Sequence, residues 1–152
     1  MPFRSVILAT CVSALMILPA DAADLITKVS PHSVPVTIDR LAAAVEGAGA
    51  TVFARVDHAA GAEKVDMELR PTELLIFGNP KLGTPAMLDS QSAGLDLPLR
   101  VLAYADAEGV VHVTYHDPAG LVETHGVPAD AEYIAMMTGA LDKLTSKAVA
   151  EE

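Results

Sequence analysis

Residues 70–100 read RPTELLIFGNPKLGTPAMLDSQSAGLDLPLR, and this stretch decides the fold. Its residues 74–77 are Leu, Leu, Ile and Phe, which are apolar on both side-chain parities. Because a strand points successive side chains to opposite faces, this run predicts a strand that is covered on both sides. The turn residues Gly78-Asn79-Pro80 and Leu82-Gly83-Thr84-Pro85 then predict a loop, which is followed by a short helix over Ala86–Ser92.

The segment before this stretch alternates between strand and helix patterns. Strands are predicted over Leu25–Val29 and over Thr51–Asp57, the second with Val52, Ala54 and Val56 pointing inward. Between them, apolar residues recur at helical spacing from a capping residue, Ser33, to a glycine stop at Gly47. A short, weak helix is predicted around Ala62–Met67.

The segment after this stretch predicts a β-hairpin. Residues Leu99–Asp106 and Val110–His116 read as strands joined by a short loop that contains Gly109. With Asp106 opposite Val110, one face of the hairpin is apolar throughout and belongs to the core. The other face is polar and aromatic, and it pairs Tyr104 with His112, Leu102 with Thr114, and Arg100 with His116.

The order of these elements predicts the fold class. A helical turn over Leu121–Gly126 and a last helix from about Pro128 follow the hairpin. Strands and helices in this order predict an α+β domain of two layers, with helices packed on a mixed or antiparallel sheet. The two-sided apolar strand at residues 74–77 then needs cover on the face that the helices leave open. The loops of residues 78–98 could supply this cover, or a second subunit could, and we expect a symmetric homodimer.

Residues 1–22 have the features of a cleaved secretory signal peptide. An apolar run from Val6 to Leu18 precedes Ala20-Asp21-Ala22, which has the small-x-small pattern of a signal peptidase site. The run is shorter than the ~20 residues of a membrane span, which disfavours an uncleaved anchor. We therefore expect a mature single domain, residues 23–152, that is periplasmic or secreted and has no membrane contact after cleavage.

Charge and cysteine content exclude several classes of function. The net charge of −10 at pH 7 argues against nucleic acid and anionic membrane surfaces as partners. The single cysteine, Cys11, lies in the predicted signal peptide. The mature domain is therefore expected to have no disulfide, thiol nucleophile or thiolate metal site.

Four segments resemble the DUF302 family, a family of domains of unknown function. They are Phe53–His58, Thr72–Pro85, Gly94–Arg100 and Tyr115–Pro118, and the resemblance extends over nearly the whole mature chain. The resemblance implies a compact α+β domain seen as a dimer. It brings no established activity, substrate, cofactor or catalytic residue.

The candidate binding residues fall into three groups. Asp57 precedes His58 at a strand end, where a carboxylate can orient an imidazole, although a solvated turn is the simpler interpretation. Asn79 and Lys81 lie in the predicted loop, where backbone N–H groups and a lysine would suit an anion. The third group is the polar hairpin face, with Arg100, Tyr104, His112 and His116.

Two classes of function remain open. The first is an exported, dimeric module that binds a small ligand or a partner through these residues. The second is an enzyme that uses His58 or His116 with Asp57 or Glu73 for acid–base chemistry, although Glu73 also reads as a charged strand start.

Metal binding is only weakly indicated. His112 and His116 share a strand face about 13 Å apart, which is too far to hold one metal ion. Methionines such as Met87 and Met137 could favour Cu(I), but at helical spacing they are typical core residues. We therefore predict no bound cofactor or metal.

Overall fold

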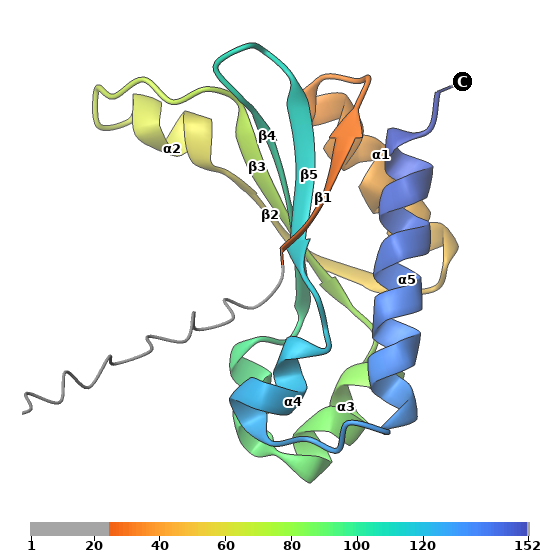
Figure 1. Cartoon of the computed structure of the whole chain (residues 1–152). Helices are drawn as coiled ribbons and strands as arrows, with labels where there is room; N and C mark the ends of the chain where they lie inside the picture. Colours follow the sequence, from red (N-terminus) through yellow and green to blue (C-terminus); the bar gives the residue numbers. More distant parts are fainter. Residues whose placement is uncertain (1–24, 152) are drawn as a thin grey trace, which may run out of the picture.

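The computed structural model describes residues 25–151, so the predicted signal peptide, residues 1–22, lies outside the described residues. The described chain contains strands, α-helices and a short 3₁₀ helix (Figure 1). Their bounds are β1 Leu25–Ser30, α1 Val34–Gly47, β2 Thr51–Asp57, α2 His58–Glu63, β3 Thr72–Gly78, α3 Pro80–Asp89, η1 Gln91–Leu95, β4 Leu99–Ala105, β5 Val111–His116, α4 Gly120–His125 and α5 Glu132–Val149.

The strands form one antiparallel sheet with the order β1-β5-β4-β3-β2. This confirms the predicted α+β class of helices on an antiparallel sheet. The hairpin register is also confirmed, because Ala103 pairs with Val113 and Tyr104 pairs with His112. The sheet therefore places the first described strand, β1, beside the last, β5.

Helices α1 and α5 pack side by side against one face of the sheet (Figure 1). The apolar stripe of α1 includes Ile38 and Leu41, which are fully buried. They meet the alternate strand residues Leu75, Val101 and Val113 in the main core. Burying each such side chain stabilises the fold by roughly 1.5–3 kcal/mol, which is why these elements form one layer on another.

A second, smaller core lies at one end of the sheet and holds α3, η1 and α4 together (Figure 1). Ala86 of α3 and Ala93 of η1 are fully buried there, against Leu121 of α4 and Met137 of α5. This cluster adjoins the main core through Leu99 and α5, and it supports the segments that precede β4 and follow β5.

The opposite face of the sheet is left open by α1 and α5, and α2 lies on that side only near the end of β2 and the start of β3 (Figure 1). On β3, Leu75 and Phe77 are buried under the helices, whereas Leu74 and Ile76 point to this open face and are half-buried. The predicted cover on both sides of β3 is therefore found on one side within the described chain, and the other side is only half-buried.

The predicted loop at residues 78–85 is wrong, because helix α3 begins at Pro80 and continues through Pro85. Asn79 is its N-cap, and the Asn79 side-chain oxygen accepts a hydrogen bond from the Lys81 backbone N–H at 3.0 Å. Asn followed by Pro is a signal for a turn and also for a helix start. Proline suits the first helical position because the backbone N–H that it lacks would have no partner within the helix there.

The start of α2 and the side-chain parity of β2 also differ from the prediction, although the predicted bounds of β2, Thr51–Asp57, are confirmed. Helix α2 begins at His58 rather than Ala62, because Asp57 caps it by accepting a hydrogen bond from the Ala60 N–H. In β2, a register shift between Val52 and Ala54 places these residues opposite Phe77 and Ile76, respectively. The predicted inward row of Val52, Ala54 and Val56 is therefore split between the two faces, and Val56 is exposed.

Candidate functional site

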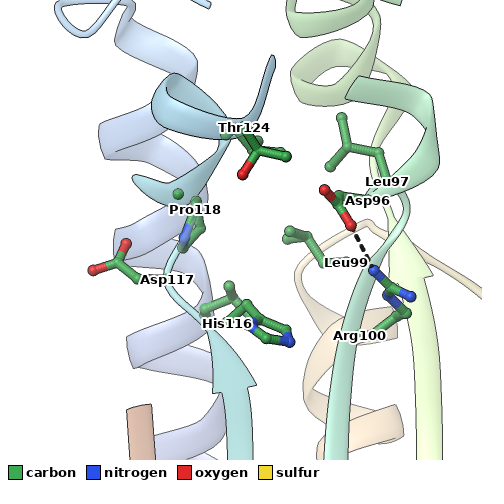
Figure 2. Close-up of a pocket in the computed structure, with 11 residues that line it drawn as sticks. Asp96, Leu97, Leu99, Arg100, His116, Asp117, Pro118 and Thr124 are labelled. Carbon is green, nitrogen blue, oxygen red and sulfur yellow. Dashed lines mark hydrogen bonds and ion pairs between the residues drawn. The ribbon is translucent and has the colours of Figure 1, made fainter. Parts of the chain in front are cut away.

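A polar pocket of about 150 Å³ lies where β4 begins and β5 ends, beside helix α4. Figure 2 shows Arg100, His116, Asp96 and Thr124 around it, with Leu97 and Leu99 in its wall. The polar groups come from the residue that follows η1, which is Asp96, and from β4, β5 and α4. The antiparallel pairing of β4 with β5 is what brings these distant parts of the sequence together.

Arg100 and His116 occupy the positions that the predicted hairpin register gives them. Continuing the observed pairing of Leu102 with Thr114 by two residues places Arg100 opposite His116. Both side chains point to the open face of the sheet, and the His116 ring points toward the Arg100 side chain (Figure 2). Two of the predicted binding residues therefore line one pocket.

The Asp96 carboxylate is the polar centre of the pocket wall. Its Oδ1 accepts a hydrogen bond from the Arg100 guanidinium at 3.0 Å, and its Oδ2 lies 2.7 Å from Nε2 of His125. The hydrogen bond to His125 is the main reason that the pKa of Asp96 is lowered, with a smaller contribution from Arg100. Asp96 is therefore a fixed negative charge that positions the arginine.

His125 and Ser92 hold this carboxylate in place from behind. The Ser92 hydroxyl lies 2.9 Å from Nδ1 of His125, so both ring nitrogens of this histidine are engaged. The His125 side chain is only 3% exposed. Ser92 lies outside the pocket lining, so this chain of contacts joins η1 to α4 rather than presenting a nucleophile to the pocket.

Ser92, Asp96 and His125 are not among the predicted site residues. The sequence does hold a signal for Asp96, because it is an acidic residue between Leu95 and Leu97. A charged residue within an apolar run indicates a polar group with a specific partner. His125 had no such signal, because its partner lies 29 positions earlier in the sequence.

Arg100 retains hydrogen-bonding capacity toward the pocket. One terminal nitrogen of Arg100 donates a hydrogen bond to Asp96, and Arg100 has no other hydrogen-bond partner among residues 25–151. A guanidinium offers five N–H donors in a planar fork that matches a carboxylate or phosphate. The pocket can therefore accept an anionic group beside Arg100 and His116.

The two other residues of the polar hairpin face lie away from this pocket. Tyr104 stacks on His112 with ring centroids 5.2 Å apart, and Nε2 of His112 lies 2.7 Å from Oδ2 of Asp106. The contact with His112 lowers the pKa of Asp106, which also accepts backbone hydrogen bonds from Glu108 and Val110. This cluster closes the hairpin turn.

The remaining predicted site residues serve as helix caps or are exposed. Asp57 and Asn79 cap α2 and α3, and His58 and Lys81 are exposed at the starts of those helices. None of the four lines the polar pocket, although Asn79 lines a second, apolar cavity.

Glu73 is a buried acid, so the interpretation as a charged strand start is wrong. Its side chain is 8% exposed, and its Oε2 accepts a hydrogen bond from Nε of Arg55 on β2. Arg55 also pairs with Asp39 of α1, and the contact with Glu73 is the main reason that the pKa of Arg55 is raised. Glu73 is thus committed to an ion pair on the helix-covered side of the sheet.

The described residues hold no group of three or more His, Asp or Glu side chains that could bind a metal ion. Met87 and Met137 both line the apolar cavity, while Met136 is exposed. The absence of a bound metal remains a prediction.

The structure resembles a solved protein, the crystal structure of an uncharacterized conserved DUF302 protein from Bacillus stearothermophilus. The TM-score is 0.74 at 20% sequence identity, over 84% of this chain and 99% of that one. At this identity the likeness supports the fold. It confirms a domain of the same architecture.

Sequence similarity extends to proteins named fluoride-specific ion channels. The chain is 50% identical over 117 residues to Fluoride-specific ion channel FluC 1 of Brucella suis, which covers 76% of this chain and 46% of that protein. The corresponding protein of Brucella abortus is also 50% identical, with 43% of its length covered. The chain thus spans less than half the length of these curated relatives.

Two further findings bear on these relatives and on the family. Across residues 25–151, every helix is too short or too polar to traverse a lipid bilayer. The model of the family described as Domain of unknown function DUF302 matches residues 26–144, which is most of the chain. The chain therefore belongs to the DUF302 family.

Proposed function

We propose that this domain is a binding module for a small anionic molecule, which the polar pocket receives beside Arg100 and His116. The observation that carries the proposal is the partly unused guanidinium of Arg100 in a pocket of about 150 Å³. An arginine can hold a carboxylate by two parallel hydrogen bonds. In a pocket these bonds replace those to water, whereas on an open surface water would solvate the guanidinium equally well.

Arg100 is the group in the pocket that can attract a small carboxylate, while Asp96 and Asp117 also line it. The chain has a net charge of −10, so an anion is repelled from most of the surface and needs a local cation. Asp96 fixes Arg100 from one side and leaves the other side of the fork free. Leu97, Leu99 and Leu121 supply apolar walls for a short carbon chain. Thr124 adds a hydroxyl that can donate a hydrogen bond.

A thermal-shift screen of small carboxylates and phosphates tests this proposal. A ligand at ten times its Kd stabilises the folded state by about 1.4 kcal/mol, which raises Tm by roughly 5 °C in a domain of this size. Replacing Arg100 with Gln should weaken the binding of any hit by roughly 10- to 100-fold, because a charge-assisted hydrogen-bond pair is lost.

The matched control for this test is Lys143→Gln, which removes the same charge from an exposed position on α5. It should leave the affinity unchanged. Equal binding by wild type and Arg100→Gln would overturn the proposal, as would a screen in which only cations or neutral compounds stabilise the protein.

A fluoride-linked role is a second candidate, which we propose because of the 50% identity to proteins named fluoride-specific ion channels. Fluoride is an anion that accepts strong hydrogen bonds, so the same pocket is its expected site. The screen distinguishes the two candidates if it includes sodium fluoride and sodium chloride at equal ionic strength. A stabilisation specific to fluoride and lost in Arg100→Gln would favour this candidate over the organic acid.

We also propose that the domain is exported and that the mature chain begins at or near Ala23. The support is the apolar run from Val6 to Leu18 and the small-residue site at Ala20-Asp21-Ala22. Intact-mass measurement on protein recovered from the cell envelope or medium should show a chain without Cys11. Recovery of a soluble product that retains Cys11 would contradict it.

A further inference from the structure

We infer that a second cavity, lying across the Leu97–Leu99 segment from the polar pocket, is a binding site for a neutral apolar molecule with one or two aromatic rings. The cavity has a volume of about 410 Å³, and Leu97 and Leu99 line both pockets. This site goes beyond the proposed anion site and does not depend on it.

The lining of the cavity determines the class of ligand. No charged residue lines it, and its walls are mainly the side chains of Phe53, Leu82, Met87, Leu97, Leu99 and Met137. Apolar cavities of ~150 Å³ are known to bind benzene, so a space of this size has room for two fused or linked rings. The thioethers of the two methionines adapt to varied shapes and contact ring edges favourably.

Phe53 forms one wall of the cavity, and in the unliganded protein much of its apolar ring is exposed to water. It lies at the register shift of β2 and remains 55% exposed, which is unusual for a phenylalanine beside a core. A β-bulge commonly turns a side chain toward a site. A Cβ on Gly78 would lie 3.3 Å from Cβ of Pro98 and 3.5 Å from the Phe53 ring, so the glycine lets these two groups approach the strand.

Gly83 leaves the cavity open from the side of helix α3. A glycine inside a helix is less stable than an alanine, and Gly83 does not need the left-handed conformation. A Cβ at this position would point at Cδ1 of Leu97, 3.9 Å away, and Cε of Met87, 4.0 Å away. The missing side chain is therefore space that a ligand can occupy.

Polar groups at the edge allow the ligand one hydrogen-bonding substituent. The Asn79 side-chain oxygen caps α3, which leaves its amide N–H groups without a partner among the described residues. Thr84 lies on the same helix and also lines the cavity. A ring with a single hydroxyl, carbonyl or amine group fits this combination, and a charged group does not.

Titration with 1-naphthylamine, a neutral dye of two fused rings whose fluorescence shifts to shorter wavelength in apolar sites, tests the inference directly. The protein contains no tryptophan, so the dye can be excited without interference from one. We expect saturable binding to the wild type and at least tenfold weaker binding to Gly83→Leu, in which the new side chain extends into the cavity toward Leu97 and Met87. Arg100→Gln should bind the dye as the wild type does, which separates this site from the anion site.

The matched control is Gly139→Leu, which adds the same side chain to helix α5 at a position with no atom within 4 Å of the new Cβ. It should leave dye binding unchanged. Methyl NMR of ¹³C-labelled methionine gives a second readout that needs no variant. The dye should shift the signals of Met87 and Met137, while the exposed Met67 and Met136 stay unchanged.

Two results would overturn the inference. One is equal dye binding by Gly83→Leu and the wild type. The other is a titration that moves the signals of Met67 or Met136 and leaves those of Met87 and Met137 in place, because the dye would then bind an exposed surface.

Discussion

Replacing Arg55 with Met should lower the free energy of unfolding by about 2–3 kcal/mol, since it leaves the Glu73 carboxylate buried without its cation. The Glu73 side chain is 8% exposed and lies on the helix-covered side of the sheet, whereas Arg55 is 38% exposed and reaches it from the neighbouring strand. Urea unfolding at pH 7, followed by circular dichroism, measures the effect.

Two further variants show whether the uncompensated charge is the cause. Asp39→Asn removes the other carboxylate partner of Arg55, which is exposed, and should cost less than about 1 kcal/mol, as surface ion pairs do. Combining Arg55→Met with Glu73→Leu should recover most of the lost stability, because a buried ion pair and an apolar pair of similar size are often equivalent. If Arg55→Met alone is as stable as the wild type, Glu73 finds other solvation and the explanation fails.

The second large effect concerns assembly, for which we propose a symmetric homodimer through the open face of the sheet. Leu74 and Ile76 of β3 are half-buried there, next to Leu102 of β4. By the alternation of side chains, the residues of the five strands that point to this face include no Asp or Glu. Two copies of a chain with a net charge of −10 can thus meet here without placing carboxylates opposite each other.

Ile76→Asp should convert this dimer into a folded monomer, since it places two carboxylates in the interface and removes two apolar side chains. Light scattering at micromolar concentration should report twice the chain mass for the wild type and the chain mass for the variant. Leu75→Asp is the informative contrast, because Leu75 is 1% exposed under α1 and its replacement should unfold the protein. A wild-type monomer at this concentration would disprove the assembly.

Much of the fold follows from local patterns in the sequence. The hairpin of β4 and β5 was predictable because a short Gly loop sets the register, and the register sets which residues share a face. The same register places Arg100 beside His116, which is where both residues line the polar pocket. The DUF302 resemblance agreed with the family match over residues 26–144.

Other features depend on information that local patterns do not contain. Asn79-Pro80 begins a helix instead of a loop because Ala86 and Ala93 find a small core under α3 and η1, and packing outweighs the glycine and the second proline. The contact of Asp96 with His125 joins segments 29 residues apart, which sequence spacing alone cannot reveal. The parity of β2 was missed because a bulge leaves no distinct signature in a short apolar run.

The sheet order also has a consequence for when the domain can fold. The first described strand, β1, lies at the sheet edge and pairs with β5, so the side chains of Thr27 and Thr114 meet across 87 positions of sequence. Lys28 on the same strand is bound by Asp142 of α5, across 114 positions. A growing chain that still lacks β5 and α5 holds neither partner of β1, and such long-range pairings form slowly. The sheet would therefore remain incomplete until synthesis is nearly finished. A chain in this state is still unfolded enough to pass through a protein-translocation channel.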